Sequence, residues 1–148
     1  MTVIDTSVFI DAMFERDPAR GAVARRFLQS IEGLTVYVPR VALVELISVA
    51  KRKKLDVTRK DILDFAEDID ILSEDVIFDE ALAVAENIHP RAIDAYFIAT
   101  AKVTDSILIA NDKTMVRNAR DSITAYNLLE EEESVILALS KIRTPTSG

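Results

Sequence analysis

Four acidic residues of the chain stand among apolar neighbours, and together they could hold a metal ion. Asp5 and Asp112 each follow a short apolar run, whereas Glu45 and Asp94 are the single charges of two apolar segments. Carboxylates held close together repel one another unless a cation joins them. The chain has no Cys and only one His, and sites built from oxygen ligands favour hard ions. These residue types therefore predict a site for Mg²⁺ or Mn²⁺.

The positions of these acids predict that they meet at one edge of a sheet. Val3 and Ile4 are typical of the end of a buried strand, and Asp5 follows them directly. Asp112 follows the apolar run 107–110 in the same manner, one residue further on. In open α/β sheets, ligands bind at the edge formed by the carboxyl ends of the strands. Acids near the starts of two apolar helices could reach that same edge.

Each acid taken alone also has a structural interpretation. Glu45 could face solvent from a helix with one thin exposed stripe, although its same-face neighbours are mostly apolar. Asp94 lies in the first turn of its predicted helix, where an acid is favourable and where Arg91 could pair with it. Asp112 could be an ordinary N-cap. The prediction of a site therefore depends on the four acids as a set.

Short apolar runs alternate with helical patterns along the chain, which predicts the elements that would position these acids. Strands are expected up to Ile4 and at 35–38, 106–109 and 122–126, while 69–78 is ambiguous between a short strand and irregular packing. Helices are expected at 6–14, 19–31, 41–50, 80–88, 92–103, 113–120 and 129–142, with another after Thr58. Helix starts are indicated by Asp17-Pro18, by a capping box of Thr58 with Asp61, and by Asp79 and Asn127. This alternation predicts one α/β domain over 1–143 with a mainly parallel sheet, followed by a flexible tail at 144–148.

The composition is that of a globular chain of one domain, with 148 residues of which 49% are apolar and 29% charged. The absence of cysteine excludes disulfides and thiolate zinc sites and suits a reducing cytoplasm. His89, beside Pro90, is expected to be a loop residue rather than a ligand, and one histidine argues against a Ser-His-Asp triad. No apolar run approaches the roughly 18 residues of a membrane span, so we expect a cytoplasmic protein.

The net charge of −7 argues against a general nucleic-acid binder, because such proteins are usually basic. Any role with nucleic acid would require a local basic patch and bound cations. Lys113 and Arg117 are candidates because they follow Asp112 and lie one helical turn apart, and Arg40 is a further candidate. The basic run 51–54 is more simply interpreted as a solvated helix end.

The order and spacing of these motifs resemble the PIN-domain proteins of the VapC toxin type. The matching segments are 3–7, 44–46, Asp94 with 99–101, and 109–112, and the resemblance covers nearly the whole chain. Four motifs in register make the resemblance fairly specific. It implies a three-layer α/β/α sandwich and a metal-dependent ribonuclease that hydrolyses phosphodiester bonds of RNA.

The resemblance also implies roles for single residues and for partners. The metal ligands would be Asp5, Glu45, Asp94 and Asp112, with support from the Ser7 hydroxyl and from Asn111. The toxin type further implies a small antitoxin protein and a homodimer of the nuclease. The apolar helix faces near Phe9, Phe14 and Phe27 could form one of these surfaces.

Two departures from the family pattern leave alternatives open. The family often has Thr or Ser two residues before the last acid, where this chain has Ala110, and Met115 leaves no extra acid just after Asp112. Ala110 and the acidic surface favour an alternative, a PIN-like module with weak or no catalysis that binds RNA or protein. Phosphoryl transfer through an aspartyl phosphate on Asp5 is a remote third hypothesis, because Ser7 occupies the place of the second Asp in the usual phosphatase arrangement.

Overall fold

Five parallel strands form one central sheet in the computed structural model, which describes residues 1–14 and 16–143. Every strand pairing is parallel. The predicted α/β class is therefore confirmed, whereas the tail expected at 144–148 lies outside the described residues. In their order across the sheet, the strands are β3 (Asp70–Leu72), β2 (Val36–Pro39), β1 (Thr2–Ile4), β4 (Ile107–Ala110) and β5 (Ala125–Asn127).

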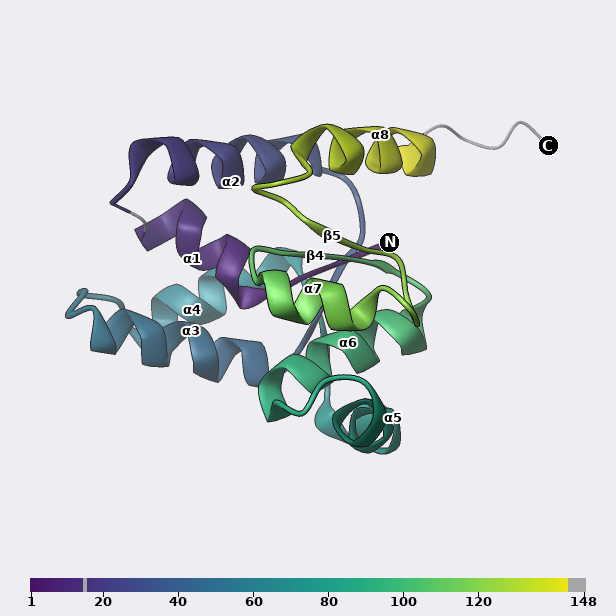
Figure 1. Cartoon of the computed structure of the whole chain (residues 1–148). Helices are drawn as coiled ribbons and strands as arrows, with labels where there is room; N and C mark the ends of the chain where they lie inside the picture. The colour runs from purple at the N-terminus through teal and green to yellow at the C-terminus, as the bar shows by residue number, and fades with distance from the viewer. Residues whose placement is uncertain (15, 144–148) are drawn as a thin grey trace.

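Helices cover both faces of this sheet, as Figure 1 shows, with α2 and α8 on one side and α6 and α7 on the other. α5 packs on the outside of α6. α3 and α4 lie side by side at the left of the view, where α3 also contacts α1. This is the three-layer α/β/α sandwich that the resemblance implied. The helices are α1 (Thr6–Phe14), α2 (Pro18–Ser30), α3 (Val41–Arg52), α4 (Arg59–Phe65), the 3₁₀ helix η1 (Ala66–Asp68), α5 (Glu74–Asn87), α6 (Ala92–Thr104), α7 (Lys113–Ala119) and α8 (Glu132–Arg143).

The strand order places a topological switch point beside the central strand β1. From β1 the chain adds β2 and then β3 on one side, and later it adds β4 and β5 on the other. Ligands of open α/β sheets bind at such a reversal, outside the carboxyl ends of the strands. The register pairs Ile4 with Ile109. The residues that follow these two, among them Asp5 and Asn111, therefore leave the sheet at the same point.

The central strands are rigid because they are buried on both faces. Val3 and Ile4 of β1 and Leu108 and Ile109 of β4 are fully buried in the core, as is Phe97 of α6. Near-continuous apolar runs of this kind are typical of parallel strands covered by helices on both sides.

Among the described residues, no helix combines the length and the apolar character that crossing a membrane would require.

Two of the predicted helix starts are confirmed in detail. Oδ1 of Asp17 accepts the backbone N–H of Ala19 at 3.0 Å, and Pro18 is the first residue of α2. Thr58 and Asp61 form a reciprocal capping box in front of α4, with distances of 3.2 Å and 2.8 Å. Each cap satisfies backbone donors that a helix leaves without partners at its N-terminus.

The helix predicted to start at Glu80 with Asp79 as its N-cap in fact begins at Glu74, so that prediction is wrong. The ambiguous segment 69–78 contains β3 and then the first turns of α5, with Ser73 at the N-cap position. Acidic residues in the first turn favour a helix N-terminus, and Ile77 of the added turn is fully buried. Burial of this apolar face determines where α5 begins.

β5 and α8 also begin later than predicted. The backbone N–H groups of Ser122 and Ile123 both donate to the carbonyl of Ala119 at 3.0 Å, which closes the end of α7 before the strand starts. Asn127 ends β5, and its Oδ1 accepts the N–H of Glu130 at 3.1 Å. Asn127 therefore caps a turn, and α8 starts only at Glu132.

Candidate active site

Asp5 is the central acid of the candidate site and lies directly after β1. It is 5% exposed, and its backbone N–H donates to the carbonyl of Ile109 at 2.9 Å, which continues the pairing of β1 with β4. The hydroxyl of Ser7 donates to Oδ2 of Asp5 at 2.6 Å, and the N–H of Ser7 approaches the same oxygen at 3.2 Å. The sheet edge and the first turn of α1 thus fix the position of this carboxylate.

Two further acids lie close enough to Asp5 to change its ionisation. Burial raises the pKa of Asp5 to about 7, the Ser7 hydroxyl opposes this rise, and the charges of Glu45 and Asp94 add to it. α3 carries Glu45 and α6 carries Asp94, and both residues are half-buried. The structure therefore brings three of the four predicted acids together at the carboxyl edge of the sheet.

Glu45 is held in the same electrostatic environment. Burial and the charge of Asp94 raise the pKa of Glu45, while Thr6 and Arg52 lower it. The hydroxyl oxygen of Thr6 is fully buried and has no partner of full hydrogen-bond geometry among the described residues. Between Val41 and Ala50 the exposed residue is Val44, at 62%, whereas Glu45 is half-buried, so Glu45 does not form the solvated stripe of the structural interpretation.

Asp112 lies at the neighbouring strand end, where it caps α7. Its Oδ1 accepts the N–H of Met115 at 3.0 Å, as the N-cap interpretation of the sequence anticipated. Its charge is not among the causes of the raised pKa values of Asp5 and Glu45. Asp112 is half-buried after β4. It therefore belongs to the same edge of the sheet, outside the group of three acids.

The donor set of this edge fits a hard divalent cation that keeps part of its water shell. In the described parts of the chain, no three Asp, Glu or His side chains are placed to hold an ion directly. Mg²⁺ commonly keeps several waters and binds proteins through only one or two carboxylates. Burial is the largest cause of the raised pKa values of Asp5 and Glu45, neighbouring acids add to it, and Arg52 offsets part of the rise for Glu45. A bound cation would favour the ionised form of both carboxylates.

Asn111 supports the site through its backbone, and its side chain connects α1 with the segment that follows β5. Its N–H donates to the Ser7 hydroxyl at 2.9 Å. Its amide Nδ2 donates to Oδ2 of Asp11 at 2.7 Å, while its Oδ1 accepts the N–H of Leu129 at 3.2 Å. Asp11 is 3% exposed and also pairs with Arg20 at 2.9 Å. The role of Asp11 could not be predicted from the sequence, because Asp11 stands in an ordinary helical pattern.

Asp94 has a partner that the sequence did not indicate. His89 lies in the loop before α6, as predicted, yet only 2% of it is exposed. Its Nε2 lies 2.8 Å from Oδ2 of Asp94, and its Nδ1 lies 2.9 Å from Nδ2 of Asn118 on α7. The pair of Asp94 with Arg91 that the structural interpretation offered is not formed among the described residues, where Arg91 is exposed.

Basic residues predicted to position a substrate are exposed, and two of them already form ion pairs. Arg40 pairs with Glu74 at 2.7 Å, and Lys113 pairs with Glu130 at 2.8 Å. Arg117 is exposed on α7. Exposed ion pairs of this kind are weak and exchange readily with other anions.

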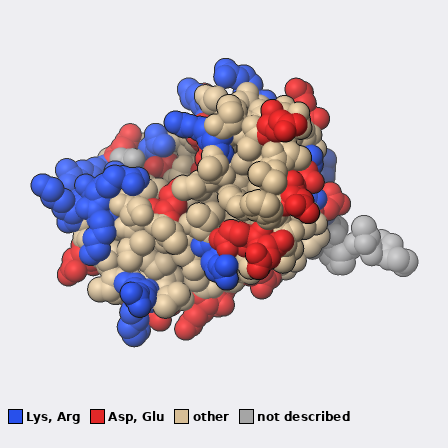
Figure 2. Space-filling view, turned by 90° about the horizontal axis from the view of Figure 1, so that it is seen from below, with Lys and Arg blue, Asp and Glu red and all other residues tan. Residues whose placement is uncertain are grey.

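A dense group of basic side chains lies where α3 meets α4, at the left of Figure 2. We call it the α3–α4 basic cluster, and all its members are exposed. Arg52 of the cluster lowers the pKa of Glu45, so its charge reaches the acidic site. Arg52 is therefore the member of the cluster that the structure connects with the acidic site. Its members are Lys51, Arg52, Lys53, Lys54, Arg59 and Lys60.

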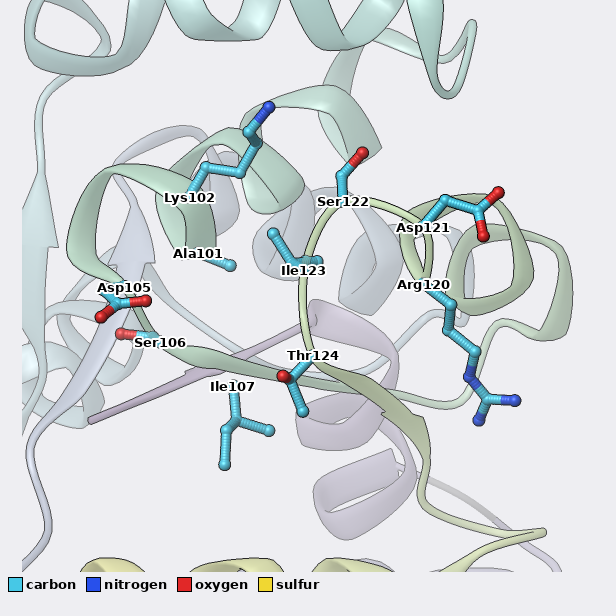
Figure 3. A pocket seen from close by; sticks show the side chains of 10 residues that line it. All are labelled: Ala101, Lys102, Asp105, Ser106, Ile107, Arg120, Asp121, Ser122, Ile123 and Thr124. Atoms are coloured by element: carbon cyan, nitrogen blue, oxygen red, sulfur yellow. The ribbon is translucent and has the colours of Figure 1, made fainter.

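A hollow of about 480 Å³ lies beside the start of β4, away from the acids. Figure 3 shows that Lys102 and Arg120 at its rim point away from one another. Lys102 pairs with Glu80 at 2.8 Å, and Arg120 pairs with Glu131. The amino ends of the strands border this hollow, so it is not part of the candidate site.

Comparison with known proteins gives one family and several structures of the same fold. A family model described as the PIN domain matches residues 2–121. No curated protein matches the chain. A toxin–antitoxin complex from Klebsiella pneumoniae is similar over 77% of this chain and 89% of that one, with 18% identity and a TM-score of 0.62.

Two further solved structures have comparable similarity. FitAcB from Neisseria gonorrhoeae aligns with 87% of this chain and 99% of its own, with 20% identity and a TM-score of 0.57. A protein from Pyrobaculum aerophilum aligns with 95% of this chain and 96% of its own, with 16% identity and a TM-score of 0.58. At these identities the structures establish a shared fold.

Proposed function

The chain belongs to the PIN domain family, and from this premise we propose that it is a metal-dependent endoribonuclease acting as the toxin of a toxin–antitoxin pair. The observation that carries the proposal is the grouping of buried Asp5 with Glu45 and Asp94, whose charges both act on Asp5. Three carboxylates that repel one another at a ligand-binding edge of the sheet are suited to a divalent cation.

The roles of the side chains follow from their positions. Asp5, Glu45 and Asp94 would hold Mg²⁺ or Mn²⁺, with Asp112 contributing from the end of β4. When bound, such an ion supplies an activated water and neutralises charge on the reacting phosphate. Ser7 orients Asp5 and favours its ionised form through the 2.6 Å hydrogen bond.

Ala110, where the family often has a hydroxyl residue, does not leave Asp5 without a hydroxyl partner. Ala110 is fully buried within the core, and its carbonyl accepts the N–H of Leu128 at 2.9 Å. A threonine at this position would add atoms to a packed core, at a cost of about 1–3 kcal/mol. The hydroxyl next to the central acid comes from Ser7 instead.

RNA would bind through exposed cations around the acids. The α3–α4 basic cluster offers such charges within a chain whose net charge is −7. Its position along α3 from Glu45 suits a phosphate chain that passes from the cluster to the acids. Arg40, Lys113 and Arg117 remain candidates on the other sides of the edge.

The proposed partners are a small antitoxin protein and a second copy of the chain. Support for an antitoxin is the similarity in fold to a toxin–antitoxin complex. The cytoplasm is the proposed location, which the absence of cysteine suits. Of the three phenylalanines expected near such a surface, Phe9 and Phe27 are buried within the core and Phe14 is half-buried.

A PIN-like module that binds RNA without cleaving it is the second candidate. The observation that favours it is that no three potential ligands in the described residues are placed to hold an ion directly. This candidate predicts RNA binding that does not change when Asp94 is replaced by Asn. It also predicts that intact RNA persists in every metal.

The two candidates separate in one experiment on the pure full-length chain. A mixed RNA pool is incubated with the protein and Mg²⁺, Mn²⁺ or EDTA, alongside Asp94→Asn. The nuclease proposal predicts cleavage that requires metal and is lost in the variant. Cleavage that persists in EDTA, or RNA that stays intact in both metals while still bound, would contradict it.

A further inference from the structure

His89 is buried between an acid of the candidate site and an amide of another helix. Its Nε2 lies 2.8 Å from Oδ2 of Asp94, and its Nδ1 lies 2.9 Å from Nδ2 of Asn118. The loop before α6, α6 itself and α7 thus meet in one chain of hydrogen bonds. Only 2% of the histidine is exposed, whereas the side chain of Asp94 is 18% exposed. The histidine supports Asp94 from the protein interior.

The direction of these hydrogen bonds follows from the chemistry of the groups. Nδ2 of Asn118 can only donate, so Nδ1 of His89 must be the ring nitrogen without a proton. The ring proton therefore lies on Nε2, which donates to Oδ2 of Asp94. Asn118 thus selects the imidazole form that gives Asp94 a donor. The bond uses Oδ2 and leaves Oδ1 to bind another ligand.

We propose that His89 is a positioning residue that fixes the carboxylate of Asp94 for metal binding, with Asn118 setting its tautomer. This inference rests on the proposed metal-dependent function. A hydrogen bond from a buried ring removes rotamer freedom from the aspartate before any ion binds. Partners that orient metal ligands in this way typically contribute about 10–100-fold to metal affinity.

The place of Asp94 explains why its orientation matters. Its charge raises the pKa of Asp5 and of Glu45, so its carboxylate acts on both other acids. A buried ring N–H needs an acceptor, and here the acceptor is the Asp94 carboxylate. The geometry therefore connects a fully enclosed ring to the one acid that is shared by the whole group.

Replacement variants can separate the hydrogen bond from packing. The amide nitrogen of Gln reaches roughly the place of Nε2, whereas that of Asn reaches only the place of Nδ1, on the side of Asn118. His89→Gln should therefore keep most of the Mn²⁺ affinity, while His89→Asn and His89→Leu should lose about 10–100-fold. Mn²⁺ affinity of the pure full-length chain is measured by titration calorimetry or by the EPR signal of free Mn²⁺. Equal affinities for the Gln and Asn variants would overturn the proposal, even if His89→Leu failed to fold.

A double-variant cycle tests whether His89 acts through Asp94. In the Asp94→Asn background, His89→Asn should cause little further loss of Mn²⁺ affinity, because the carboxylate that it orients is gone. A full additional loss would overturn the proposal and indicate a structural role. Wild-type protein that binds no Mn²⁺ would overturn the metal-dependent function and this inference together. Normal binding that Asp94→Asn weakens and His89→Asn leaves unchanged would overturn the inference alone.

The tautomer can be observed directly because His89 is the only histidine of the chain. In protein labelled with ¹⁵N-histidine, the proposal predicts a protonated Nε2 and an unprotonated Nδ1 at pH 7.5. It also predicts that Mg²⁺ shifts the Nε2 signal in the wild type and leaves it unchanged in Asp94→Asn. A proton on Nδ1, alone or together with one on Nε2, would overturn the assignment.

Discussion

The hydroxyl of Ser7 donates a 2.6 Å hydrogen bond to Oδ2 of Asp5, and it accepts the N–H of Asn111 at 2.9 Å. One side chain thus joins the end of β1 to the end of β4. Because the hydroxyl donates to the carboxylate, it favours the ionised form and lowers the pKa of Asp5 against the effects of burial and of neighbouring acids. The charge of the central acid therefore depends on Ser7.

Replacing Ser7 by Ala should raise the pKa of Asp5 further above about 7. Fewer molecules then carry an ionised Asp5 at pH 7, and a hydrogen bond to a charged group is worth about 1.5–3 kcal/mol. We expect RNA cleavage to fall about tenfold at pH 7 and to recover partly at pH 9. Ser7→Thr keeps a hydroxyl and is the matched control. A loss of the same size at both pH values would show that Ser7 does not act through the ionisation of Asp5.

Replacing Asp5 by Asn should stabilise the metal-free protein at neutral pH. Well below pH 3.8 the wild-type carboxyl is protonated in the folded and unfolded states, so it contributes no pH dependence there. Between its ordinary pKa of 3.8 and the folded value of about 7, only the unfolded chain loses the proton, and the free energy of unfolding falls. The loss remains above pH 7. At about 1.4 kcal/mol per pKa unit, the advantage of the asparagine is on the order of a few kcal/mol at pH 8.

Urea unfolding of the wild type and Asp5→Asn at pH 4 and pH 8 in EDTA measures this difference. The advantage of the variant should be small at pH 4 and large at pH 8. Adding Mg²⁺ at pH 8 should reduce it, because the ion binds and stabilises the folded wild type. Glu45→Gln should show the same sign, since burial and Asp94 also raise the pKa of Glu45. An advantage of the variant that does not grow with pH would contradict the raised pKa of Asp5.

The sequence predicted the fold well wherever local signals and burial agreed. Asp17-Pro18 and the Thr58–Asp61 box mark helix starts through hydrogen bonds between near neighbours, which sequence spacing reveals. The local signal for the start of α5 is weaker, because Ser73 at the N-cap position makes no capping hydrogen bond with its side chain, and Ile77 of the first turns is buried in the core. The start of α8 was predicted too early for a different reason, because Asn127 caps a turn in front of the helix.

In the candidate site, too, residues with local sequence signals were predicted and residues with distant partners were missed. Asp5 and Asp112 were recognisable because each follows a buried run, and the structure places both at one edge of the sheet. His89 and Asp11 were missed because their partners are distant or stand outside any regular spacing. Asp11 contacts an asparagine 100 positions away, and His89 contacts one 29 positions away. Only the folded chain reveals such contacts.

Replacing Asp11 by Ala should destabilise the protein without removing the site. The change leaves the amide of Asn111 without its 2.7 Å acceptor and also removes the ion pair with Arg20. An unsatisfied buried donor costs about 1–3 kcal/mol, so the midpoint of urea unfolding should fall accordingly. Mn²⁺ affinity of the folded variant should stay within about threefold of the wild type. A loss of affinity as large as that of Asp94→Asn would instead make Asp11 part of the metal site.

Replacing Arg52 by Gln should weaken RNA binding and alter the ionisation of Glu45. Arg52 lowers the pKa of Glu45, so its removal should raise that pKa further. It should also remove one phosphate contact, which reduces the slope of log affinity against log salt by about 0.7 for single-stranded RNA. Fluorescence anisotropy with a labelled RNA in EDTA measures binding apart from cleavage.

Lys141→Gln is the matched control, because this exposed residue of α8 loses the same charge on an element distant from α3. If RNA follows the α3–α4 basic cluster to the acids, Arg52→Gln should reduce affinity several-fold at 100 mM salt while Lys141→Gln changes it little. Equal effects of the two substitutions would mean that RNA responds only to the net charge of the protein. The cluster would then have no special role in RNA binding.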